Sequence, residues 1–230
     1  MIIKHNKGKK YLIRQNSKGE KMDKVKKMTI EDNEEFLRQV SKPVIFPDKE
    51  LENNIKLLEQ YFTESDTTLA LAAVQIGIPK RLIYLKNTDL EIINRKNNDQ
   101  ETEEDKQHNE RRILINPVII SREGLTEYWE ACASCLDNLG KLKRPYKIVI
   151  RYQDINGQYH DEVFEGFEST VLSHEMDHLD GILHMDKAEE LLVMTKEERK
   201  EFRKTHGYEI ISQSGKYEDL LKDKKVLKKK

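Results

Sequence analysis

One pentapeptide contains the side chains that most clearly indicate catalysis: His174-Glu175-Met176-Asp177-His178. On a helix, residues four apart lie on the same face, so the two imidazoles can bind one metal ion. Glu175 lies beside them and can contact a water molecule on that metal without being a ligand itself. The plainer alternative is a helix with two exposed histidines and no metal.

The residues around this motif argue against that alternative. Apolar residues occur on more than one side of the predicted helix 171–179, which indicates a buried, central position. Two buried histidines need polar partners, and a shared metal ion is the simplest one. Asp177 either accepts a hydrogen bond from a group behind the site or is an ordinary polar residue of the helix, and the sequence leaves both open.

A cysteine pair, Cys132 and Cys135, supplies the third candidate ligand. Without a secretory signal, metal binding or redox chemistry is favoured over a structural disulfide. One thiolate and two imidazoles leave a tetrahedral position open for water, which is typical of a catalytic site. Ligation by both cysteines would instead give a closed, structural site.

The strands that must position these groups are grouped together along the chain, and the helix with both histidines follows them. Helices are predicted over 30–40, 51–62, 171–179 and 186–206. Strands are predicted over 81–85, 113–120, 147–152 and 159–164. Pro117 should place the second strand at an edge or bend it, and Asn156-Gly157 is a strong hairpin signal. We therefore expect an α+β fold with antiparallel strands packed around a central helix that carries both histidines.

Composition divides the chain into three parts. Residues 1–29 form a basic extension, 30–188 the expected catalytic domain, and 189–230 a charged helix followed by a lysine-rich tail. Within the catalytic domain, 87–112 has little periodicity and is expected to be a surface insertion.

Charge and hydropathy indicate the cellular compartment and the kinds of partner to expect. No apolar run approaches the roughly 20 residues of a membrane span, and the first residues lack a secretory signal, so we expect a cytoplasmic protein without membrane or DNA partners. Residues 1–27 contain ten Lys or Arg and 221–230 contain six Lys. Such basic ends can dock on an RNA-rich surface such as a ribosome, although solvated termini are the plainer interpretation.

Three motifs make the chain resemble the peptide deformylase family, whose motifs read G-x-G-L-A-A-x-Q, E-G-C-x-S and H-E-x-D-H. They appear here in the same order as Thr68-Leu-Ala-Leu-Ala-Ala-Val-Gln75, Glu130-Ala-Cys-Ala-Ser134 and the pentapeptide 174–178. The resemblance covers roughly residues 34–187. It implies metal-dependent removal of the N-formyl group from the N-terminal methionine of newly made polypeptides, with release of formate.

The resemblance also implies a role for particular residues. Cys132, His174 and His178 would hold one ion, commonly Fe²⁺, although the ligand types equally admit Zn²⁺, Co²⁺ or Ni²⁺. Glu175 would be the general base, and the Gln75 amide and the backbone N–H of Ala133 would stabilise the charge on the formyl oxygen. Substrate-binding positions implied by the family are Leu69, Ala70, Glu130, Ala131 and Val171, of which Leu69 and Val171 could equally be core residues.

Three positions depart from the family motifs: Thr68, Ala70 and Ala131 replace glycines. The added side chains should narrow the cleft in which the substrate backbone pairs, and any of these positions that needs a positive φ would be strained. We therefore expect intact metal chemistry, with peptide affinity and specificity as the properties that could differ from those of the family.

Three rival hypotheses remain at this stage. A shifted alignment would make Cys135 the ligand. A zinc endopeptidase would need a downstream third ligand such as Glu197 or Glu198. A non-catalytic or altered-specificity deformylase-like protein would bind peptides or ribosomes, although the intact Glu175 and Gln75 argue for the enzyme.

Overall fold

The computed structural model describes residues 2–6, 9–13, 25–64, 68–86, 102 and 111–223. Of the predicted insertion 87–112, only residues 102, 111 and 112 are described, so that prediction lies almost entirely outside the described residues. Within the N-terminal extension, β1 (Ile2–Asn6) and β2 (Lys9–Ile13) pair antiparallel. No helix among the described residues is long and apolar enough to cross a membrane.

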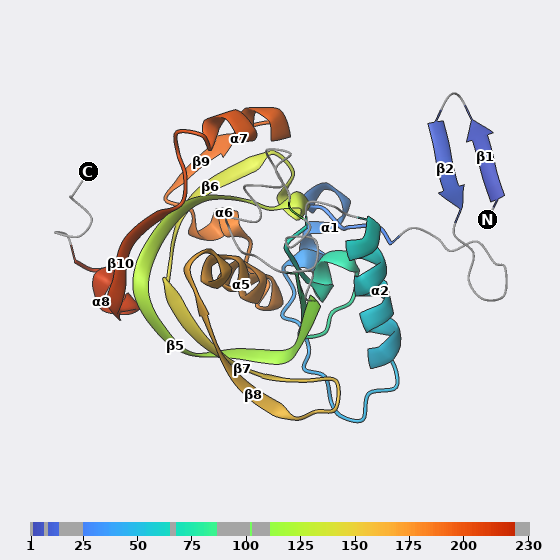
Figure 1. Ribbon diagram of the computed structural model, residues 1–230, viewed down its shortest axis with the longest axis horizontal. Coiled ribbons are helices and arrows are strands. Elements are labelled where there is room, and N and C mark those ends of the chain that lie inside the picture. Colours follow the sequence, from blue (N-terminus) through green and yellow to red (C-terminus); the bar gives the residue numbers. More distant parts are fainter. Residues whose placement is uncertain are drawn as a thin grey trace.

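A single antiparallel sheet organises the rest of the described chain (Figure 1). Its strands are β3 (Ala70–Ala72), β4 (Leu82–Lys86), β5 (Arg111–Ala131), β6 (Asn138–Arg144), β7 (Lys147–Gln153), β8 (Tyr159–Glu165), β9 (Glu190–Val193) and β10 (Glu209–Lys216). The path runs β3-β4-β5-β6-β9, β7 pairs with β5 and β8, and β10 pairs with β5. The predicted hairpin at Asn156-Gly157 joins β7 to β8, and Gly157 has φ +78°.

The 21-residue strand β5 holds the sheet together because it pairs with four other strands. It bends where Pro117 was expected to bend it: Asn116 has φ 52°, and the register with β7 shifts between Ile115 and Val118. The strand continues to Ala131, well past the predicted end. Gly124, at φ +71°, allows β10 to lie against this strand, because a Cβ there would lie 2.5 Å from the carbonyl oxygen of Ser212 in β10.

Two helices precede the sheet. The first, α1 (Ile30–Leu37), stops three residues before the predicted end and is capped by Thr29. The second, α2 (Leu51–Glu64), buries the predicted stripe, with Leu51, Leu58 and Phe62 in the core.

The helix α5 (Gly166–Leu179) lies inside the curve of β5 and carries the predicted His-Glu-x-x-His sequence (Figure 1). It begins five residues earlier than predicted because Gly166, at φ +61°, turns the chain directly from β8 into the helix. Leu172, Met176 and Leu179 pack into a core cluster with β3, β4, β7 and β8. The predicted α+β class, with a central helix against antiparallel strands, is confirmed.

The predicted helix 186–206 is wrong. That segment contains α6 (His184–Lys187), the strand β9 and α7 (Lys196–Phe202). Residues 190–193 pair with β6, so a sheet contact outweighs their helical charge pattern. The following residues were predicted to be a polar tail, but β10 and α8 (Tyr217–Leu220) pack on β5, and only 224–230 lie outside the described residues.

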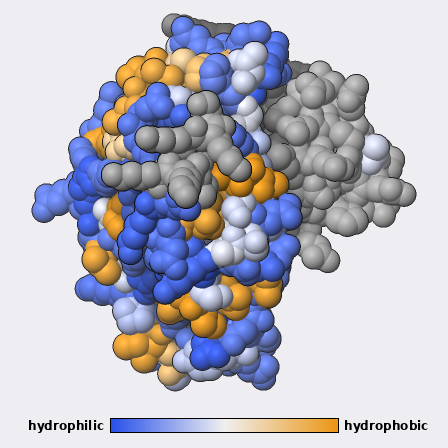
Figure 2. Space-filling model, turned by 90° about the vertical axis from the view of Figure 1, so that its left-hand side faces the viewer, coloured by the Kyte–Doolittle hydropathy of each residue, from blue (hydrophilic) through white to orange (hydrophobic). Residues whose placement is uncertain are grey.

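Figure 2 shows the face of the molecule that carries β10 and α8. Hydrophobic residues on this face are interspersed with hydrophilic ones rather than gathered in one continuous area. Such a pattern is typical of an antiparallel sheet that has one face packed and the other solvated.

Candidate metal centre

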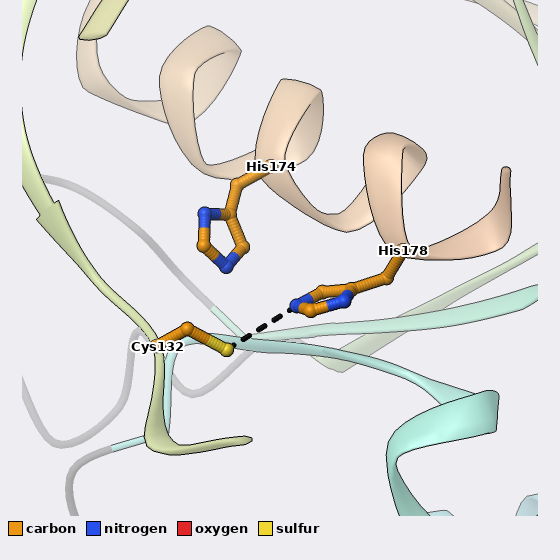
Figure 3. A group of neighbouring side chains, drawn as sticks. All are labelled: Cys132, His174 and His178. Carbon is orange, nitrogen blue, oxygen red and sulfur yellow. Dashed lines mark hydrogen bonds between the residues drawn. The ribbon is translucent and has the colours of Figure 1, made fainter. Parts of the chain in front are cut away.

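Cys132, His174 and His178 converge at the point where β5 ends beside α5 (Figure 3). Cys132 follows β5 directly and precedes the 3₁₀ turn η2 (Ala133–Cys135). The ligand atoms of the three residues all lie within 4.8 Å of one another, and Sγ of Cys132 is 3.2 Å from Nε2 of His178. Cys132 is 5% exposed and His178 is fully buried.

These distances fit a single metal ion. Zinc–sulfur and zinc–nitrogen bonds of about 2.3 and 2.0–2.1 Å place tetrahedral ligand atoms roughly 3.3–3.6 Å apart. Among the described residues, the group contains three potential ligands and no fourth. Three protein ligands leave one coordination position for water or substrate, which is typical of a catalytic centre.

A buried ion network stands behind His174. Nδ1 of His174 donates to Oε2 of Glu130 at 2.9 Å, and Arg144 binds the same carboxylate through Nε at 2.7 Å and Nη2 at 2.9 Å. Burial opposes the ionisation of Glu130, but Arg144 and His174 outweigh it and hold the pKa of this carboxyl well below its ordinary value. Both oxygens of Glu130 are bound by protein groups, so this carboxylate fixes the orientation of the His174 ring, and its substrate-binding role stays a prediction.

Asp177 completes the network. Its carboxylate accepts from Nη1 of Arg144 at 2.6 Å and from Nζ of Lys187 at 2.6 Å. It is therefore the acceptor behind the site that the sequence left open. Arg144 and Lys187 were not predicted, and the strand 138–144 that carries Arg144 was itself not among the predicted strands.

Cys135 is not part of the ligand group. Its thiol donates to Sγ of Cys132, which lowers the pKa of Cys132 and raises the pKa of Cys135. The lowered pKa favours Cys132 over Cys135 as the anionic ligand, and Cys135 is fully buried beside it. This arrangement argues against both the shifted alignment and a closed site with two cysteines.

The three motifs meet at this centre. Gln75, from the 3₁₀ turn η1 (Ala73–Ile76), donates through Nε2 to Sγ of Cys132 at 3.4 Å and to Oγ of Ser134 at 3.1 Å. The backbone N–H of Ala72 donates to Oε2 of Glu175 at 2.7 Å and to Oε1 of Gln75 at 3.1 Å. Ala72 and Ser134 therefore orient the two polar side chains, a role that the sequence did not reveal.

The glycine replacements cause no backbone strain. In the described part of the chain, the non-glycine residues with positive φ are Asn116 and Leu136, so Thr68, Ala70 and Ala131 all lie outside the left-handed region. Ala70 is buried in β3, and Val171 packs against the same core cluster while remaining partly exposed. The carbonyl of Leu69, also partly exposed, accepts from the backbone N–H of Lys86.

The endopeptidase hypothesis fails on its third ligand. Glu197 and Glu198 are exposed on α7, and the Glu198 carboxylate accepts from the N–H and hydroxyl of Thr195 as part of a helix cap. The side chain that joins the two histidines is that of Cys132.

Comparison with known proteins identifies the family to which the region containing this centre belongs. The model of the polypeptide deformylase family matches residues 26–193. The chain belongs to the peptide deformylase family. Its similarity to the peptide deformylase of Pelagibacter ubique is 35% identity over 164 residues, covering 70% of this chain and 85% of that protein. Similarity to the peptide deformylase of Novosphingobium aromaticivorans is 34% over 156 residues, covering 65% and 82%.

Solved structures show the same similarity. A probable peptide deformylase from Synechococcus phage S-SSM7 aligns with a TM-score of 0.58 at 32% identity, covering 70% of this chain and 98% of that one. The peptide deformylase of Synechococcus elongatus, solved in complex with actinonin, aligns with a TM-score of 0.57 at 30% identity, covering 79% and 86%. The predicted family and enzyme class, a metal-dependent hydrolase, are confirmed.

Proposed function

We propose that the centre formed by Cys132, His174 and His178 performs the deformylase reaction: hydrolysis of the N-formyl group of formyl-methionyl polypeptides, with release of formate. The observation that carries this proposal is the convergence of the three ligand atoms within 4.8 Å, with Glu175 on the same helix and Gln75 bonded to the ligand sulfur. The non-catalytic alternative would not require these two polar side chains to be oriented at the site.

The donor set fits Fe²⁺ as well as Zn²⁺, Co²⁺ or Ni²⁺, and we propose one Fe²⁺ per chain by analogy with the family. Bound there, the metal supplies a Lewis acid and lowers the pKa of water toward neutrality. His174 and His178 must be neutral to ligate, and the hydrogen bond from Nδ1 of His174 to Glu130 leaves Nε2 of that ring for the metal.

Glu175 is proposed as the general base. One of its oxygens, Oε2, is held by the N–H of Ala72 at 2.7 Å, which fixes the carboxylate in a buried position beside the ligands. The other oxygen can accept the proton of the attacking water and then pass it to the leaving amine. Removing this side chain should therefore stop the chemistry without removing a metal ligand.

Charge that develops on the formyl oxygen needs hydrogen-bond donors already in place. Oε1 of Gln75 accepts from Ala72, which turns the amide nitrogen toward Cys132 and Ser134. We propose that, when substrate is bound, the N–H of Gln75 that donates to Ser134 turns to the formyl oxygen, which also accepts from the backbone N–H of Ala133. Only the backbone of Ala133 is used, and its own side chain is exposed.

Two strand edges face the centre and can pair with an extended peptide. In β3, the N–H of Ala72 points to Glu175, and backbone groups of alternate residues point the same way, so those of Ala70 face the same side. In β5, the carbonyl of Trp129 accepts from Arg203 on the side away from β6, which directs the backbone groups of Ala131 to that side. We propose that the substrate backbone lies between Ala70 and Ala131.

The remaining proposals concern the extent of the catalytic unit, the cellular compartment and contact with the ribosome. We propose that residues 30–188 are the catalytic unit, that the protein acts in the cytoplasm on nascent chains, and that the basic segments 1–29 and 221–230 favour the ribosome surface. The support is their charge alone. Ribosome co-sedimentation at low and high salt tests the last point, because electrostatic docking weakens as salt screens the charges.

Formate release from a formyl-Met peptide by anaerobically purified, iron-loaded protein tests the reaction. Glu175→Ala should abolish release while metal content stays at one ion per chain. The matched control is Glu168→Ala, on the same helix but paired with Arg112, which should remain active. Absence of formate from the intact, metal-loaded protein would overturn the proposal.

A further inference from the structure

The centre lies at one end of a regular contact between β5 and α5. Alternate residues of a strand share a face. Two residues of β5, and Cys132, which continues the alternation in extended conformation just after it, each contact a residue of α5. The three contacts are Cys132 with His178 at 3.2 Å, Glu130 with His174 at 2.9 Å, and the ring of Tyr128 with the ring of Phe167 at 5.4 Å between centroids.

Val171 occupies the interval between the last two contacts. It follows Phe167 by four residues and precedes His174 by three, so all three lie on one face of α5. Val171, Phe167 and Tyr128 are each partly exposed, unlike the fully buried His178 and Cys135 at the opposite end. The partly exposed apolar surface beside the metal ligands therefore extends from His174 toward Phe167.

Tyr208 closes the far end of this surface. Its ring meets the ring of Phe167 edge-on at 5.5 Å and that of Tyr128 at 6.0 Å. Its hydroxyl is buried close to the hydroxyls of Thr126 and Thr170 without reaching hydrogen-bond geometry. Because Tyr208 lies beyond residue 193, where the family match ends, this ring is an addition to the matched region.

The position of Tyr208 is held by the segment around it. Directly after it, Glu209 pairs with Glu127 at the start of the β10–β5 contact. Before it, Arg203 lies over the ring of Tyr128 at 5.1 Å and donates to the carbonyl of Trp129 at 2.7 Å. Tyr208 is therefore fixed by the sheet rather than placed on a free tail.

We propose that Tyr208 is a specificity-determining residue, which with Tyr128 and Phe167 forms the far end of the subsite for the first side chain of the substrate. The inference rests on the proposed function, since it needs the formyl group at the metal centre. An unbranched thioether suits such a subsite, because methionine is apolar and flexible and its sulfur contacts aromatic ring edges favourably. The Tyr208 ring sets the length that the subsite accepts.

The test compares kcat/KM for two formylated peptides that differ only in the first residue, methionine or the bulkier phenylalanine. Tyr208→Ala should reduce the methionine-to-phenylalanine ratio about tenfold or more, since size discrimination in apolar subsites is of this order. Tyr208→Phe keeps the ring and should leave the ratio within about twofold. If Tyr208→Ala does not fold, Tyr208→Leu, which keeps apolar bulk but shortens the wall, replaces it with the same expected direction.

The matched control is Tyr217→Ala, in the same C-terminal segment but bonded to the carbonyl of Lys143 outside the cluster. It should leave the ratio unchanged, which separates a subsite effect from loosening of the segment. An unchanged ratio in Tyr208→Ala or Tyr208→Leu, or an equal change in the Tyr217 control, overturns the inference. A wild-type protein that releases no formate from either peptide would instead overturn the proposed function, so the two failures are distinguishable.

Discussion

Glu130 and His174 form the hydrogen bond that links the metal centre to the sheet. Nδ1 of His174 lies 2.9 Å from Oε2 of Glu130, and Arg144 binds both oxygens of that carboxylate. The bond sets the tautomer of His174 and orients Nε2 toward Cys132. Glu130 of β5 therefore determines which ring nitrogen of His174, on α5, is available to the metal.

Glu130→Gln should therefore weaken metal binding without removing a ligand. An amide is a poorer acceptor than a carboxylate, and loss of such a partner typically costs 10–100-fold in metal affinity. Competition with a chelator measures the change. Glu127→Gln is the control, since this buried glutamate of the same strand pairs with Lys141 instead. Equal metal affinity in Glu130→Gln and the wild type would contradict the assigned role.

The two cysteines should respond differently to replacement by serine. Cys132→Ser removes the ligand sulfur and should lose most of the metal. Cys135→Ser should keep it, since the serine hydroxyl can still donate to Sγ of Cys132. Metal analysis of the two purified variants decides the matter, and the assignment is wrong if Cys135→Ser is the one that loses metal.

Arg144 and Arg151 are a matched pair for stability. Arg144 is buried between Glu130 and Asp177, whereas Arg151 pairs with Asp161 and its side chain is 55% exposed. Arg144→Ala removes the buried cation that Glu130 and Asp177 share, and it should lower the free energy of unfolding by about 3–5 kcal/mol even though Lys187 still pairs with Asp177. Arg151→Ala should change it little, because exposed pairs are screened by solvent. Urea unfolding of both variants at pH 7 checks the contrast.

The pair formed by Asp48 and Lys80 should make stability depend on pH. Lys80 donates to Asp48 at 2.6 Å and holds the pKa of that carboxyl below its ordinary value. Since the folded pKa is the lower one, the contribution is present above about pH 5, given an unfolded value near 3.9, and is lost as pH falls through the folded pKa.

Asp48→Asn should therefore cost about 0.5 kcal/mol at pH 7 and nothing at a pH below the folded pKa. Urea titrations at neutral and acidic pH measure the difference. Glu52→Gln is the control, because its ion pair with Lys56 is far more exposed and its effect should be smaller. A penalty for Asp48→Asn that is equal at both pH values would show that lost hydrogen bonding, rather than charge, is responsible.

Local sequence patterns were sufficient to predict the features that depend only on residues close together in the chain. The spacing of His174 and His178 predicted a shared helix face, Asn156-Gly157 predicted a hairpin, and Pro117 predicted a bend. Each of these depends on backbone geometry within a few residues, so the sequence determines them without knowledge of the rest of the chain.

The tertiary structure decided what depends on distant partners. The sequence alone indicated Cys132, Glu130 and His174 but not Arg144. Only the pairing of β5 with β6 and its packing on α5 brought Glu130, Arg144 and His174 together. Pairing with β6 and with β5 made β9 and β10 of residues predicted to be helix and tail, and Tyr208, next to β10, lies beside Phe167. Such contacts join residues tens of positions apart, and their free energy arises from burial and pairing that local periodicity does not encode.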